Sequence, residues 1–339
     1  MGLLKFIVRR MLFLVFLILG VSLIVFIISH TVPSDPVLAN LSQRNMDNKE
    51  MVDAFRAKWG LDKPLAVQYA IYLGALVKGD LGLSIRTQRP VSMDLAQYFP
   101  ATMELAIFAM LLAVVFGIFF GVISAIKRNT GLDRLIRGMS VLGASVPSFW
   151  LALMVLLLFY VVLGIAPGPG RLGPRFSAPH AVTGFFVVDA LLAGDLSTAK
   201  DALAHLVLPG MVLAAFTMGL ITRTTRSSLL EILSQDYIRT ARAKGLAERE
   251  VITRHALGNA LIPVVTVIGL GFGNLLGGMV LVETIFAWPG IGRYAYQAAR
   301  NLDFPAIIGV SILIAVNYVI INLIVDILYG VLDPRVRYE

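Results

Sequence analysis

Six long apolar runs, separated by polar and charged segments, constrain what this chain can fold into. An α-helix needs roughly 20 apolar residues to cross the hydrocarbon core of a bilayer, and each run approaches that length. The expected spans are Met11–Ile28, Thr102–Ile126 (opened by Pro100), 147–165, 206–221, 262–282 and 306–331. Only 15% of the residues are charged, against about 25% in a soluble domain. The sequence therefore predicts an all-α, polytopic membrane protein with six transmembrane helices.

The distribution of lysine and arginine predicts which side each loop occupies. Six spans put both termini on one side of the membrane. If that side is the cytoplasm, the cytoplasmic segments carry a clear excess of basic residues, whereas the outer segments are balanced. The positive-inside rule therefore favours cytoplasmic N and C termini. The net charge of +8 belongs to these loops, and we expect membrane lipid, not nucleic acid, around the chain.

Three regions are expected along the chain. Residues 1–30 form an N-terminal tail and the first span, which is too long for a signal peptide and lacks a small-x-small cleavage site. Residues 31–100 form a small outer subdomain with helices near 48–59 and 65–76. Residues 101–339 form the membrane core, with a cytoplasmic loop at 223–263 and an outer-face helix near 185–192.

Small residues recur every fourth position in two spans, a pattern typical of close helix packing in membranes. The second span carries Ala109, Ala113, Gly117 and Gly121, and the fifth carries Gly269, Gly273 and Gly277. The stretch Gly143–Trp150, which contains Pro147, predicts a break near the membrane boundary. It is either a simple kink or a discontinuous helix that lines a path.

One face of the sixth span is polar. Ser311, Tyr318, Asn322 and Asp326 fall within one helical face, and lipid would not tolerate that face. They are candidates for a translocation path. For Asp326, pairing with an arginine of a neighbouring segment is the competing interpretation.

No group of catalytic or metal-binding side chains is expected. The chain has no cysteine, and its four histidines are scattered without ligand spacing. No span places a serine or an acid at workable spacing from a histidine. We expect no catalytic residue, no metal site and no enzymatic activity in this chain.

The cytoplasmic loop is the most informative polar stretch. Asp236 or Ser234 is expected to cap a short helix over 237–244, and Gly245 suits the position after it that needs a positive φ. A second helix over 248–259 should lead to Pro263 in the first turn of the fifth span. Small and basic side chains of the first helix suit a groove on a partner protein. The residues proposed to dock are Asp236, Tyr237, Arg239, Thr240, Ala241, Arg242, Ala243, Lys244 and Gly245.

These residues resemble a known motif. Asp236–Leu246, followed by Arg254–Pro263, is similar to the EAA loop of ABC importer permeases in the dipeptide, oligopeptide and nickel branch. Arg239-Thr240-Ala241 stands in place of Glu-Ala-Ala, so an ion pair from a glutamate is not expected. Other stretches typical of this branch are 33–36, 60–64, Gly79–Gly82, Glu283–Gly292 and 333–335.

The resemblance implies a type I ABC importer permease fold and a role in binding-protein-dependent import of di- or oligopeptides or related small solutes across a bacterial inner membrane. It implies a heterodimer with a second homologous permease, two cytoplasmic ATPase subunits and an extracytoplasmic substrate-binding protein. The Walker A pattern is absent from this chain, so ATP and Mg²⁺ are expected to bind the ATPase subunits. Glutathione, 5-aminolevulinate and nickel chelates are other substrates open within the branch.

Two other functions and one other role of the loop stay open at this point. A secondary transporter or channel, driven by an ion gradient, would need polar coupling groups at mid-membrane, and only Asp326 qualifies. A membrane enzyme would need a catalytic constellation that the spans lack. The basic loop could instead anchor the chain to anionic lipid, but that role does not require the small residues and Gly245.

Overall fold

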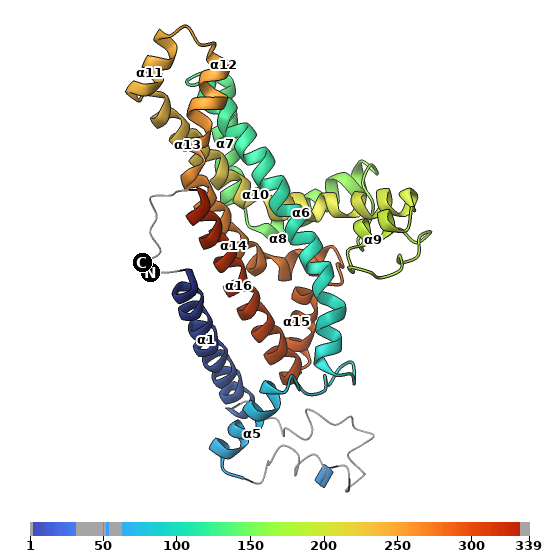
Figure 1. Cartoon of the computed structure of the whole chain (residues 1–339). Coiled ribbons are helices and arrows are strands. Elements are labelled where there is room, and N and C mark those ends of the chain that lie inside the picture. Colours follow the sequence, from blue (N-terminus) through green and yellow to red (C-terminus); the bar gives the residue numbers. More distant parts are fainter. Residues whose placement is uncertain (1–2, 32–49, 51, 54–62, 333–339) are drawn as a thin grey trace. The chain divides into compact units, whose positions relative to one another are not determined.

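The computed structural model describes residues 3–31, 50, 52–53 and 63–332 (Figure 1). Within that part of the chain the regular elements are helices, with one isolated bridge between Leu83 and Pro90. The chain divides into two compact units. Unit 1 comprises residues 1–6, 103–288 and 320–339, and unit 2 comprises residues 7–102 and 289–319. The all-α prediction is confirmed.

Helices long and apolar enough to span a membrane account for most of the predicted runs. Three qualify in the described part: α6 (Val91–Ile126), α10 (Leu196–Leu233) and α16 (Phe304–Leu332). Up to five qualify if two bent pairs each count as one span. The described apolar part of α1 (Leu3–Thr31), Leu12–Ile28, is shorter than these. The chain is a multi-pass membrane protein.

The bent pairs lie where proline follows a helix end. The helix α7 (Gly131–Ser145) stops before Pro147, and α8 (Ser148–Val155) with the π-helix η1 (Leu156–Val162) leaves at 110°. The break predicted at Gly143–Trp150 is therefore confirmed. The second bend, of 51°, precedes α14 (Ile262–Ile285).

Two helices begin earlier than expected. The helix α6 starts at Val91 and runs through Pro100, so the prediction that Pro100 opens it is wrong. The helix α10 starts at Leu196 instead of 206, because the Asp195 carboxylate accepts hydrogen bonds from the Ser197 and Thr198 N–H groups at 3.1 and 3.0 Å. Polar side chains of its first turns hide this extension from a search for apolar runs.

Helices of unit 1 approach closely where residues are small. A Cβ on Gly117 would lie 2.7 Å from Ile221 of α10, and one on Gly121 would lie 2.5 Å from Thr225. The packing face predicted for the second span is confirmed. In α14 a Cβ on Gly277 would meet nothing within 4 Å, whereas one on Gly271 would lie 2.6 Å from Thr217. Within this chain the close approach of α14 to α10 is therefore at Gly271, and the seam at Gly277 stays a prediction.

Unit 2 has its own apolar core. It gathers residues of the start of α6, of α15 (Ile291–Arg300) and of α16, among them Val91, Leu95, Tyr294 and Val310. The predicted outer helix at 65–76 is found as α5 (Leu65–Val77). The helix predicted at 48–59 and the motifs at 33–36, 60–64 and 333–335 fall wholly or mostly outside the described residues.

Candidate functional site: the loop between α10 and α14

The loop after α10 folds as a short helix and a longer return helix. The first, α11 (Asp236–Ala243), lies one residue earlier than predicted. Its capping was predicted wrongly. Gln235 occupies the cap position without a side-chain hydrogen bond, Ser234 Oγ donates to the Glu231 carbonyl at 2.7 Å, and Asp236 is the first helical residue.

Gly245 ends this helix as predicted. Its φ of +80° is a left-handed conformation, which glycine adopts without steric cost. A Cβ there would meet nothing within 4 Å. Backbone conformation, and not lack of space, therefore favours glycine at this position.

The helix α11 has an inner face that packs on its own chain. Ile238 and Ala241 are 0% and 7% exposed and join Leu229 of α10 and Val251 of the π-helix η2 (Val251–Ala256) in one apolar cluster. The prediction that Ala241 is available to a partner is therefore contradicted. The cluster fixes α11 to the end of α10 by apolar burial.

The outer face of α11 carries the remaining predicted residues. The exposed side chains, or in the case of Gly245 the exposed backbone, are those of Asp236, Tyr237, Arg239, Thr240, Arg242, Ala243, Lys244 and Gly245. The Arg239 guanidinium lies 3.2 Å from the Asp236 carboxylate on the same face. This surface is polar and mainly basic, with the small residues Thr240 and Ala243 between the charges.

An ion pair links α11 to the return helix. Arg242 donates to both carboxylate oxygens of Glu248, at 2.6 and 3.0 Å. These hydrogen bonds hold the pKa of Glu248 below its ordinary value and that of Arg242 above. The Asn259 amide donates to Tyr237 Oη at 3.0 Å. The loop is thus closed by its own side chains.

The return helix was predicted over 248–259 and is found as α12 (Glu248–Glu250), η2 and α13 (Leu257–Ala260). Pro263 lies in the first turn of α14, as predicted. The π-helical central part of the return helix, η2, was not predicted, because no residue type in the sequence identifies a π-helix. Such segments are frequent at functional sites.

Family models match nearly the whole chain. Residues 117–338 match the family described as "Binding-protein-dependent transport system inner membrane component", and residues 3–106 match its N-terminal counterpart. The chain belongs to this family of transport-system membrane components.

Curated relatives extend along the full length of this transport component. The probable D,D-dipeptide transport system permease protein DdpB of Escherichia coli (strain K12) is 49% identical over 95% of this chain and 94% of its own length. The dipeptide transport system permease protein DppB of Alkalihalophilus pseudofirmus is 42% identical over 99% of this chain and 100% of its own length. The resemblance inferred from the loop motif is confirmed.

A solved structure shows the same fold. The inward-facing MetNI methionine ABC transporter matches with a TM-score of 0.53 and 18% identity, over 70% of this chain and 96% of that chain. The transport component therefore has the fold of an ABC importer permease, as predicted.

The predicted path residues all lie on α16 of this transport component. Ser311 Oγ donates to the Ile307 carbonyl at 2.8 Å, and Tyr318 is 46% exposed. Asn322 is partly buried. The Asp326 side chain lies outside the described residues. Their role in a path stays a prediction.

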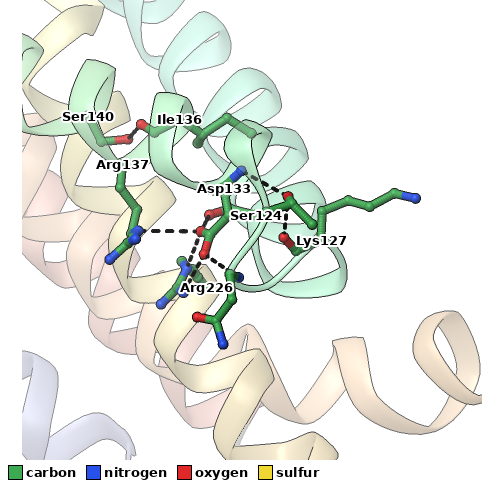
Figure 2. Close-up of polar contacts among 9 residues, drawn as sticks. Ser124, Lys127, Asp133, Ile136, Arg137, Ser140 and Arg226 are labelled. Atoms are coloured by element: carbon green, nitrogen blue, oxygen red, sulfur yellow. Dashed lines mark hydrogen bonds and ion pairs between the residues drawn. The ribbon is translucent and has the colours of Figure 1, made fainter.

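One buried polar cluster in unit 1 was not predicted. Asp133, at the start of α7, is 0% exposed and faces Arg226 of α10 and Ser124 of α6 (Figure 2). In the sequence, Asp133 and Arg226 both fall outside the predicted spans. Their separation of 93 positions left no local signal for the pairing.

A second buried ion pair was also missed. Arg171 pairs with Glu104 of α6, and its guanidinium lies 3.5 Å from the ring centroid of Phe186. Phe186 begins α9 (Phe186–Leu192), the helix predicted near 185–192. Asp189 of α9 accepts hydrogen bonds from the Thr183 and Gly184 N–H groups at 2.8 and 2.9 Å. These contacts attach the segment between η1 and α10 to α6 within unit 1.

Proposed function

We propose that this chain is the permease subunit of an ATP-driven importer of di- or oligopeptides and forms half of the translocation path. The observation that carries the coupling role is the two-faced helix α11. Its apolar side is fixed to the end of α10 by Ile238 and Ala241, and its basic side is exposed. A load applied to the outer face would therefore reach α10.

The partners proposed are a second homologous permease, two ATPase subunits and an extracytoplasmic substrate-binding protein. The family name itself specifies dependence on a binding protein. ATP and Mg²⁺ would be held by the ATPase subunits, and this chain would contribute no catalytic residue or cofactor site. Substrate choice would rest mostly with the binding protein. The peptide class is supported by the names of the relatives.

The orientation proposed places both termini and the loop 223–263 on the cytoplasmic side of a bacterial inner membrane. The excess of basic residues in the segments assigned to that side supports it. The outer face of α11 is then accessible to soluble ATPase subunits. The binding protein would approach the opposite side, to which this orientation assigns residues 31–100.

The import cycle proposed uses rigid elements with two arrangements. ATP-driven closure of the partner subunits would displace α11, and with it the end of α10. The return helix would carry the displacement to α14 through the 51° bend. Ser311, Tyr318, Asn322 and Asp326 would line part of the path that opens alternately to each side.

An ion-gradient-driven transporter is the competing function. Membership of the binding-protein-dependent family favours the ATP-driven importer. The two functions differ in the energy source that drives uptake. Reconstitution of this chain alone under an ion gradient distinguishes them.

The docking face is tested by Ala243→Glu in the complete transporter. Ala243 is exposed on α11, so the substitution leaves the apolar cluster intact but opposes an incoming surface with charge and bulk. We expect ATP-dependent peptide uptake in proteoliposomes to fall by about tenfold or more. Co-purification of the ATPase subunits should fall with it.

The matched control is Ala193→Glu, the same substitution at an exposed residue after α9. It should insert, assemble and transport like the wild type. Wild-type uptake by Ala243→Glu would rule out docking through this face of α11.

A further inference from the structure

The carboxylate of Asp133 connects three helices of unit 1. Arg226 of α10 donates to it through Nε at 2.8 Å and Nη2 at 2.9 Å. Ser124 of the last turn of α6 donates at 2.6 Å, and the Asn129 N–H between α6 and α7 at 2.9 Å. Figure 2 shows Arg226 and Ser124 directed at the Asp133 side chain.

Helix capping does not account for this arrangement. Thr130 is the N-cap residue of α7, and the Asp133 N–H donates to its hydroxyl. An acidic residue in the first turn of a helix interacts favourably with the helix dipole even when it is fully exposed, so this interaction does not require burial. Burial of a carboxylate is costly unless it is paired and fully hydrogen-bonded. The bidentate pairing with Arg226 therefore points to a role between helices.

The pair lies at one end of a close antiparallel contact between α7 and α10. A Cβ on Gly219 of α10 would lie 2.5 Å from the Ser140 carbonyl oxygen, and one on Gly143 of α7 would lie 3.1 Å from the Ala215 carbonyl oxygen. Asp133 of α7 faces Arg226 of α10, and Ser140, seven residues later in α7, faces Gly219, seven residues earlier in α10. The glycines allow backbone contact, and the ion pair opposes sliding along it.

The same stretch of α10 leads to the loop. About two turns separate Arg226 from the end of α10 at Leu233, after which α11 begins. On the other side α7 ends at the 110° bend before α8. Asp133 thus connects the first helix of the bent pair α7–α8 to the stretch of α10 that leads to the proposed docking helix.

We propose that Asp133 is a positioning residue for energy coupling, which locks α7 to α10 so that a displacement of α11 is passed to α7 and α8 as one rigid body. This inference rests on the proposed function, since it requires a load on α11. Ion pairs buried between packed helices have few alternative arrangements, so they transmit displacement instead of absorbing it.

The first test compares Asp133→Asn, Arg226→Gln and the double variant in the complete transporter, with Arg137→Gln as control. Arg137 also faces the carboxylate, at 3.5 Å, but its side chain is 48% exposed. We expect both single variants to keep the ATPase subunits bound and to lower peptide uptake per ATP hydrolysed by roughly tenfold. The double variant should be no worse than the worse single one, and Arg137→Gln should transport normally.

A distance measurement separates coupling from simple stability. The chain has no cysteine, so two spin labels can be placed on introduced cysteines, with cysteine-free partners. The pair that tests the lock itself is Arg134→Cys on α7 with Glu231→Cys at an exposed residue of α10. In an otherwise native chain this α7–α10 distance should be the same in nucleotide-free and ATP-trapped transporter. In Asp133→Asn it should broaden or shift between the two states.

Two results would overturn the inference: a state-dependent distance in the otherwise native chain, or native uptake per ATP in Asp133→Asn. Both leave the proposed function intact if the native transporter imports peptide with ATP. Absence of ATP-dependent uptake in the native transporter would instead refute the proposed function.

Discussion

At the scale of single residues, two alanines of one short helix have opposite environments. Ala241 is buried with Ile238 against α10 and the return helix, whereas Ala243 is exposed. Substitutions at these two positions therefore separate the integrity of the loop from its contact with a partner.

Ala241→Glu is expected to unfold the loop locally. It would place a carboxylate in an apolar cluster that includes Leu229 and Val251, at a cost of several kcal/mol for an unpaired buried charge. Limited proteolysis at the basic residues of 236–254 should become much faster than in the native chain. Ala243→Glu should stay as resistant as the native chain, and equal resistance of Ala241→Glu would contradict the packing described.

Some of these residues were predictable and others were not. The positive φ of Gly245 was predicted correctly, because a glycine directly after a short helix is a local signal for that conformation. Ala241 was assigned to the wrong face because its environment is set by Ala125 and Leu229, which lie on other helices. The pairing of Asp133 with Arg226 depends in the same way on how α7 meets α10.

At the scale of elements, helix identity followed from the sequence better than helix length. The apolar runs located α6, α10, α14 and α16, because burial in lipid requires such runs. Their ends were missed where polar residues continue the helix, as in Leu196–His205 of α10. The start of α6 was also missed. Pro100 was expected to begin this helix but is tolerated within it.

The closeness of α7 and α10 predicts a contrast between two glycines. Gly219→Ala would put a methyl group 2.5 Å from the Ser140 carbonyl oxygen and force the helices apart, at a cost of about 1–3 kcal/mol. Gly138→Ala meets nothing within 4 Å in the described structure and should stabilise α7 by about 0.5–1 kcal/mol.

Thermal unfolding of the purified transporter in detergent measures both effects. The midpoint should fall for Gly219→Ala and stay level or rise for Gly138→Ala. A native midpoint for Gly219→Ala would show that α7 and α10 can separate without cost, and would also weaken the argument for a rigid pair.

At the scale of the whole molecule, the chain combines membrane helices with an exposed loop, and its sequence contains no Walker A pattern. Family membership, predicted from the loop and its ordered motifs, makes it a component of a binding-protein-dependent transport system. In the proposed function, energy enters from another chain through α11. The sequence could indicate this because the loop is basic, helical and out of keeping with its apolar surroundings.

The most direct test is reconstitution of this chain in proteoliposomes with and without its partners, with uptake of a labelled dipeptide as the readout. The complete transporter, with both permeases, ATPase subunits and binding protein, should accumulate dipeptide only when ATP is supplied to the side of the ATPase subunits. This chain alone should accumulate none under a proton or sodium gradient. Gradient-driven accumulation by this chain alone, or uptake by the complete transporter without ATP, would contradict the account.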